Sequence, residues 1–103
     1  MSNLYDLEDI KELAKVGAGA PAAWKTFLDF DKASLADGAI PKKYKELMAL
    51  AVALTTQCPY CLAIHKDGAV KAGATQEEIS ETVFVAAALR AGAAVTHGTH
   101  LVG

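Results

Sequence analysis

Both cysteines of the chain lie in one short segment, Cys58-Pro59-Tyr60-Cys61, and His65 follows Cys61 by four residues. Two thiols this close can form a disulfide reversibly. Residues four apart on a helix share a face, so His65 is expected one turn from Cys61. With Cys58 as the cap and Pro59 as the first helical residue, Cys61 falls in the first turn, where the helix dipole favours a thiolate. The spacing predicts a thiol redox site in which Cys61 is the more acidic cysteine and His65 accepts its proton.

This combination is suited to the reduction of a peroxide. The thiolate attacks the O–O bond and becomes a sulfenic acid, which the second thiol captures as a disulfide. Zinc binding is the main alternative, because Cys58, Cys61 and His65 could supply three ligands. The intervals to His97 and His100 do not match zinc-finger spacings, and no metal or cofactor is predicted. These two histidines lie in an apolar segment and are expected to be structural, with a supporting role in a site shared between subunits as the alternative.

The composition argues against several other classes of protein. The chain has 103 residues, a net charge of −2 and 21% charged residues, which predicts one domain over residues 1–103 and no nucleic-acid partner. The N-terminus lacks the features of a signal peptide, and apolar runs such as 48–54 are too short to cross a membrane. A cytoplasmic protein is expected. Thiols are kept reduced there, so a CxxC pair indicates catalysis or metal binding rather than a structural disulfide.

The alanine-rich sequence favours an all-α fold with five or six helices. Pro21, Pro41 and Pro59 mark helix starts, and Thr75 and Glu78 form a capping box. The expected helices cover about 4–16, 21–35, 41–56, 59–72, 75–92 and 93–101.

Two of these helices are unusually apolar. The third is expected to be the buried centre of the fold, and segment 83–89 is apolar on every side of a helix. A monomer of this size can bury about one such helix. We therefore expect a homo-oligomer.

The motif and its surroundings resemble a known family. Cys58, Cys61 and His65 reproduce the CxxCxxxH signature of the alkylhydroperoxidase D-like proteins, within the carboxymuconolactone decarboxylase superfamily. The likeness covers most of the chain and is to the compact, single-repeat members. That family also places a glutamate twelve residues before the first cysteine, and this position is Glu46 here.

The resemblance implies a helical bundle that assembles as a hexamer or a trimer, with peroxidase or disulfide reductase activity. It assigns Cys61 as the peroxidatic cysteine, Cys58 as the resolving cysteine, and His65 with Glu46 as the proton relay. The expected partners are a hydroperoxide substrate and an electron donor that is a dithiol, a thioredoxin-like protein or dihydrolipoamide. Tyr60 departs from the best-known peroxidases, which have a histidine there. Lactone decarboxylation, which does not need the cysteine pair, and a non-enzymatic redox sensor remain alternatives.

The residues alone leave the role of Glu46 open. In an antiparallel hairpin, Glu46 would lie about 16 Å before the turn and His65 about 10 Å after it, so the sequence does not establish direct contact. The alternative is a solvated glutamate that pairs with Lys42 or Lys43 on its own helix.

Overall fold

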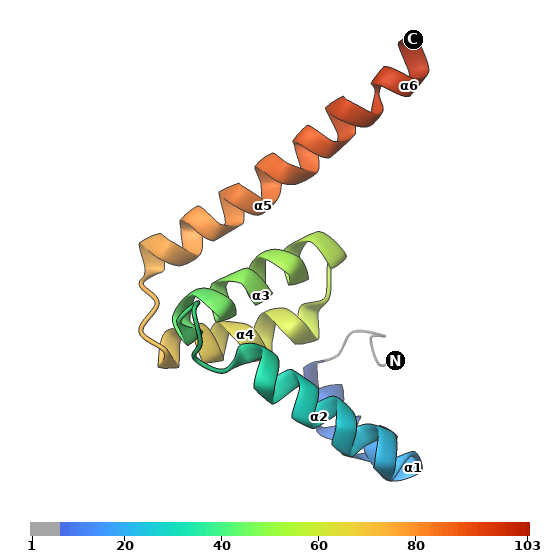
Figure 1. Ribbon diagram of the computed structural model, residues 1–103, viewed down its shortest axis with the longest axis vertical. Coiled ribbons are helices and arrows are strands. Elements are labelled where there is room, and N and C mark those ends of the chain that lie inside the picture. Colours follow the sequence, from blue (N-terminus) through green and yellow to red (C-terminus); the bar gives the residue numbers. More distant parts are fainter. Residues whose placement is uncertain (1–6) are drawn as a thin grey trace.

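The computed structural model describes residues 7–103, which are helical for most of their length (Figure 1). Leu4, in the expected first helix, lies outside the described residues. The described part forms a 3₁₀ helix, η1 (Leu7–Glu12), and six α-helices: α1 (Leu13–Gly19), α2 (Pro21–Leu35), α3 (Lys42–Thr56), α4 (Pro59–Lys71), α5 (Gln76–His97) and α6 (Thr99–Val102). The predicted all-α class is confirmed.

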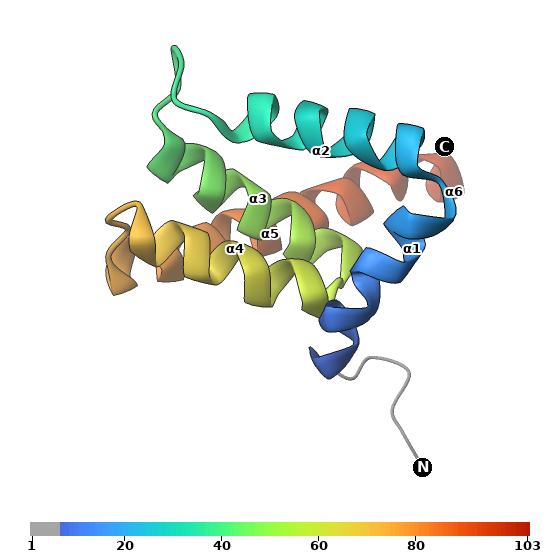
Figure 2. The same cartoon turned by 90° about the horizontal axis from the view of Figure 1, so that it is seen from below.

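Helices α3 and α4 form the central hairpin. Gln57 adopts a left-handed conformation (φ 56°, ψ 46°) that ends α3 and turns the chain into α4. In Figures 1 and 2, α2 lies on one side of this hairpin and α5 on the other. The core is small, with Leu47 and Leu50 of α3 packed against Ala69 of α4 and the partly buried Leu62, Ala74 and Ile79 around them.

The start of α5 is as predicted, but its end is not. The Glu78 amide donates to Thr75 Oγ1 at 3.1 Å and the Thr75 amide donates to Glu78 Oε1 at 2.8 Å, which is the expected capping box. The expected end near Gly92 is wrong, because α5 continues to His97. A single glycine costs a helix only about 1 kcal/mol, and alanine-rich flanks without a proline allow the helix to continue through it.

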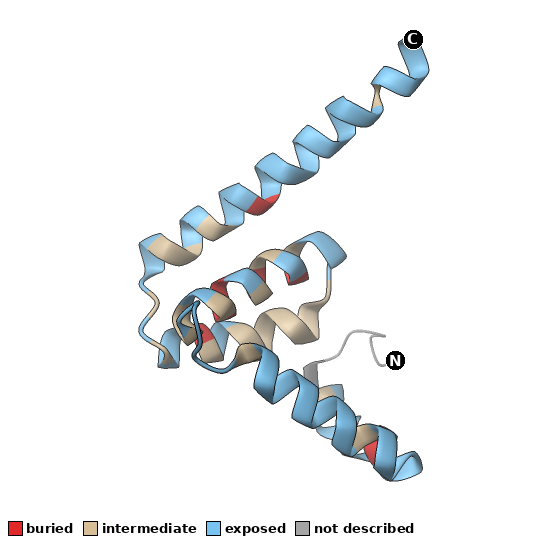
Figure 3. Ribbon diagram, in the orientation of Figure 1, coloured by how far each residue is buried: buried red, intermediate tan, exposed pale blue. Residues whose placement is uncertain are grey.

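Most of the fold is exposed (Figure 3), and the exposed residues include many large apolar side chains. The expectation that the third helix is the buried centre holds for one face only, since Tyr44 and Met48 are 46% and 53% exposed. The accessible surface is 7769 Å², against about 5,500 Å² for a compact monomer of this mass. The radius of gyration is 16.7 Å, against about 13 Å for a compact chain of this length. The isolated chain is therefore more open than a folded monomer of its size.

The C-terminal helices bear on the expectation that no segment crosses a membrane. By length and composition, the helical stretch 76–102 could cross a membrane: an 18-residue window within it has a mean hydropathy of 1.3, although the stretch contains no long unbroken apolar run. Arg90, within this stretch, donates to the carbonyl oxygens of Leu54 (3.4 Å) and Thr55 (3.1 Å) at the end of α3. This contact places α5 against protein, so its length and composition are weak evidence for a membrane span.

Candidate active site

The α3–α4 hairpin brings together two of the expected site residues. His65 Nδ1 lies 2.7 Å from Glu46 Oε2, within hydrogen-bonding distance. The sequence did not establish direct contact, because counting residues from the turn leaves the two positions about 6 Å apart along the hairpin. The long side chain of Glu46 spans this offset, so the carboxylate and the imidazole meet without an intervening water.

Glu46 is buried, with 4% of its surface exposed. Its second oxygen, Oε1, accepts a hydrogen bond from Lys42 Nζ at 3.1 Å, one turn earlier on α3. The pairing with Lys42 that the alternative interpretation expected is present, but the glutamate is not solvated. Lys43 pairs instead with Glu78 of α5 at 3.0 Å. Both oxygens of the buried carboxylate thus have a partner, as a buried charge requires.

The two cysteines meet at the start of α4. Cys58 is the N-cap residue, and its Sγ accepts a hydrogen bond from the Cys61 backbone amide at 3.3 Å. A hydrogen bond joins the Cys58 and Cys61 side chains, with the two sulfur atoms 2.6 Å apart, and both cysteines are free. The chain geometry therefore holds the two thiols in direct contact at a helix N-terminus.

The acidity of the two thiols is the reverse of the order expected from the sequence. The Cys61 side chain and backbone amide, which donate to the Cys58 sulfur, lower the pKa of Cys58. The hydrogen bond to Cys58, burial and the neighbouring charge raise the pKa of Cys61 to about 11. The prediction that Cys61 is the more acidic cysteine was wrong, because the N-terminal amide of the helix points at Cys58, its cap. As the pH rises, Cys58 is therefore the first of the two thiols to lose its proton.

His65 is connected to Glu46 rather than to sulfur. Among the described residues, no hydrogen bond joins His65 to Cys58 or Cys61, although His65 follows Cys61 by one turn of α4. With Nδ1 at the carboxylate, Nε2 is the ring nitrogen left for proton transfer. The Glu46–His65 pair borders a groove of about 480 Å³ between α2 and α4, whose walls include Lys32 and Lys71.

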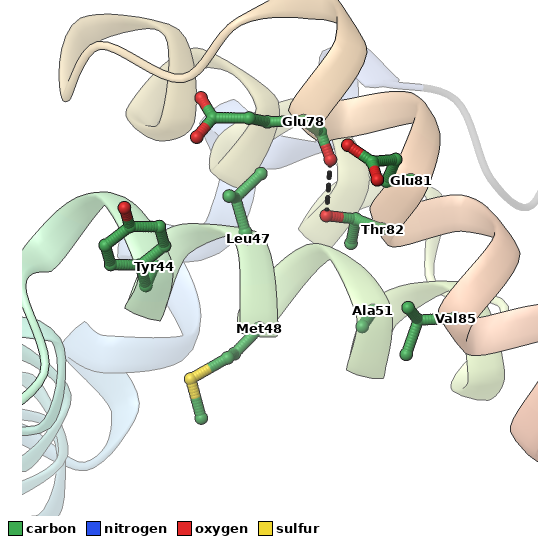
Figure 4. A pocket seen from close by; sticks show the side chains of 8 residues that line it. All are labelled: Tyr44, Leu47, Met48, Ala51, Glu78, Glu81, Thr82 and Val85. Atoms are coloured by element: carbon green, nitrogen blue, oxygen red, sulfur yellow. Dashed lines mark hydrogen bonds between the residues drawn. The ribbon is translucent and has the colours of Figure 1, made fainter.

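A separate apolar pocket lies between α3 and α5 (Figure 4). Leu47, Met48 and Val85 line it, and the carboxylate of Glu81 lies at its edge. It contains no residue of the CxxCxxxH motif. It forms part of the exposed apolar surface rather than part of the cysteine site.

The zinc interpretation receives no support from side-chain placement. Within residues 7–103, no three His, Cys, Asp or Glu side chains gather as a metal-binding group. His97 and His100 lie next to each other, with ring centroids 5.9 Å apart, where α5 meets α6.

Sequence reasoning missed one position that shapes this site, Gly68. A β-carbon built there would lie 2.7 Å from Glu46 Oε2 and 2.8 Å from Cδ. The only signal in the sequence is a glycine inside a helix, where glycine is unfavourable and needs a reason.

The fold and the site together define an all-helical protein with a CxxC dithiol at a helix start and, on the same helical hairpin, a buried glutamate paired with a partly exposed histidine. Residues 21–102 match the model of the carboxymuconolactone decarboxylase family, so the chain belongs to this family. The family has a fold of the soluble type.

Relatives are similar over most of the chain. An uncharacterized protein from the cox locus of Paracoccus denitrificans is 48% identical over 86 residues, which is 84% of this chain and 75% of the relative. An uncharacterized protein of Cupriavidus necator is 32% identical over 75 residues, 73% of this chain and 66% of the relative.

Two solved structures share the fold. A carboxymuconolactone decarboxylase family protein from Legionella pneumophila, in its apo form, has a TM-score of 0.75 and 39% identity over 81% of this chain and 75% of its own. A protein from Methanobacterium thermoautotrophicum has a TM-score of 0.81 and 27% identity, over 87% of this chain and 98% of its own.

Proposed function

We propose that this protein is a thiol-dependent oxidoreductase that reduces hydroperoxides, or disulfides, through a Cys58–Cys61 couple. The observation that carries the proposal is the contact of the two sulfur atoms, 2.6 Å apart at the start of α4. The contact of the buried Glu46 with His65, on the same hairpin, supports it further. Membership of a superfamily that includes alkylhydroperoxidase-like proteins agrees with this chemistry.

The proposed cycle begins with the pair holding one proton. The Cys58 thiolate attacks the distal oxygen of the hydroperoxide, the O–O bond breaks, and the alkoxide that leaves takes up a proton to become an alcohol. Cys61 then loses its proton and attacks the sulfur of the Cys58 sulfenic acid, forming the disulfide and releasing water. The dithiol is oxidised and the peroxide reduced by two electrons. An external dithiol, a thioredoxin-like protein or dihydrolipoamide returns the two electrons.

This order of attack is the opposite of the one the resemblance implies. We assign the first attack to Cys58 because the helix amide and the Cys61 thiol stabilise its thiolate. Burial raises the pKa of the Cys61 thiol independently of Cys58, so Cys61 needs a base in order to attack the sulfenic acid near neutral pH. His65 is the candidate for that base, with Glu46 fixing the orientation of the ring through Nδ1.

We also propose that the working protein is a homo-oligomer, with a hexamer favoured, in which a second copy covers the exposed apolar faces. Large side chains exposed on α5 and α6 include Phe84, Leu89, Val95 and Leu101. The chain exposes about 2,200 Å² more surface than a compact monomer of its mass. Obligate homodimer interfaces bury about 2,000 Å² or more in total, so the excess surface is large enough for one such interface.

We further propose that the chain is one domain and that the protein works in the cytoplasm, where dithiol donors keep thiols reduced.

The test is steady-state turnover of cumene hydroperoxide with an excess of dithiothreitol. The wild-type protein should turn over, and Cys58→Ser and Cys61→Ser should each abolish turnover. Glu46→Gln keeps the shape of the side chain and should lower the rate about 10²-fold. Glu12→Gln, which alters an exposed glutamate that pairs with Lys15, is the matched control and should not.

Absence of turnover with every dithiol and disulfide tried, together with turnover of an aromatic lactone, would instead favour a decarboxylase. A disulfide that forms in stoichiometric amounts but does not turn over would favour the redox sensor.

A further inference from the structure

Gly68 lies on α4 one turn after His65, and the two residues share the face that meets α3. The Glu46 carboxylate fills the space that a side chain at position 68 would occupy. A β-carbon there would lie 2.7 Å from Oε2, 2.8 Å from Cδ and 3.0 Å from Oε1. Carbon–oxygen contacts of this length are too short to form, so either the carboxylate or the helix would have to move.

We propose that Gly68 is a positioning residue, whose missing side chain leaves the space in which the Glu46 carboxylate meets His65 Nδ1. Only the expected loss of peroxide turnover on changing Gly68 rests on the proposed function. The geometric claim, that position 68 controls the Glu46–His65 contact, stands on the distances alone.

The carboxylate is the part that would move. It is the end of a flexible side chain, whereas α4 at this point is packed through Ala69, which is fully buried against α3. The carboxylate has little freedom to move without losing a partner, since Lys42 holds one oxygen and His65 the other. Displacing it by even 1 Å would stretch the 2.7 Å contact with His65 beyond a good hydrogen bond.

The use of glycine here is otherwise unfavourable. Glycine in a helix interior is less stable than alanine, and Gly68 does not have a positive φ that would require it. Elsewhere, Gly19 at the end of α1 and Gly92 within α5 have nothing within 4 Å of a built β-carbon. Of these three helical glycines, Gly68 is the one whose missing side chain makes room for a charged group.

The experiment compares Gly68→Ala with Gly19→Ala. Gly68→Ala should fold with unchanged helix content and lose about 10²-fold in peroxide turnover, the loss expected for Glu46→Gln, while Gly19→Ala retains full turnover. In a Glu46→Ala background, Gly68→Ala should have no further effect, because it acts only through the carboxylate. Full activity of Gly68→Ala, or losses that multiply in the double variant, would overturn the proposal.

A second measurement does not depend on activity. Nitrogen-15 NMR of the His65 ring should show a proton on Nδ1, protected by the carboxylate, in the wild-type protein and in Gly19→Ala. In Gly68→Ala, the Nδ1 proton should lose its protection from exchange with solvent. Adding Glu46→Asp to Gly68→Ala shortens the acidic side chain by one methylene, which withdraws the carboxylate and should restore part of the protection. An unchanged His65 ring spectrum in Gly68→Ala would refute the role of Gly68. If the wild-type protein reduces neither peroxides nor disulfides, the proposed function fails, and the NMR result alone decides the role of Gly68.

Discussion

Replacing Lys42 by methionine removes one of the two partners of the buried Glu46 carboxylate. Lys42 Nζ lies 3.1 Å from Glu46 Oε1, and Glu46 is 4% exposed, so water has little access to the position that the ammonium leaves. A hydrogen bond to a charged group contributes about 1.5–3 kcal/mol. Because the Lys42 side chain is itself 45% exposed, we expect the free energy of unfolding to fall by an amount near the lower end of that range, about 2 kcal/mol.

The assay is urea denaturation at one fixed protein concentration, since the stability of an oligomer depends on concentration. Lys15→Met is the matched control. It breaks the pair with Glu12, in which the two side chains are 82% and 55% exposed, and should have no measurable effect. Equal losses in Lys42→Met and Lys15→Met would refute the argument that burial of Glu46 makes its pairing important.

Three further predictions follow from the same structure. Alkylation of the reduced protein near neutral pH should label Cys58 before Cys61, because the pKa of Cys58 is lowered and that of Cys61 is raised to about 11. In Cys58→Ala, the pKa of Cys61 should fall, which can be measured as thiolate absorbance against pH. Phe84→Glu should shift the mass measured by light scattering toward the 10.8 kDa of one chain, because it places a charge on the apolar face of α5. Thr75→Ala should lower the free energy of unfolding by about 1 kcal/mol, because it removes the cap of α5.

The parts of the structure that depend on neighbouring residues could be predicted from the sequence. The cap at Cys58 and the capping box at Thr75 are patterns of four residues, and the structure contains both. The all-α class follows from composition in the same way. The end of α5 was missed because Gly92 resembles a stop signal, although the alanines around it stabilise the helix enough to continue.

The contacts between helices could not be predicted in the same way. The Glu46–His65 contact depends on how α3 and α4 cross, and the packing of Gly68 against Glu46 depends on the same crossing. The order of acidity at the cysteines was mistaken because the sequence places Cys61 in the first turn without showing where the amides point. They point at Cys58, the cap residue.

We propose above all that Cys58 and Cys61 act as one redox couple. Mass spectrometry of the reduced protein, after addition of a single equivalent of cumene hydroperoxide, tests this directly. We expect a Cys58–Cys61 disulfide within one chain in the wild-type protein, and a trappable sulfenic acid on Cys58 in Cys61→Ser. A sulfenic acid on Cys61 in Cys58→Ser, with none on Cys58 in Cys61→Ser, would reverse the order of attack. Two thiols that remain reduced in the presence of the peroxide would contradict the peroxidase function itself.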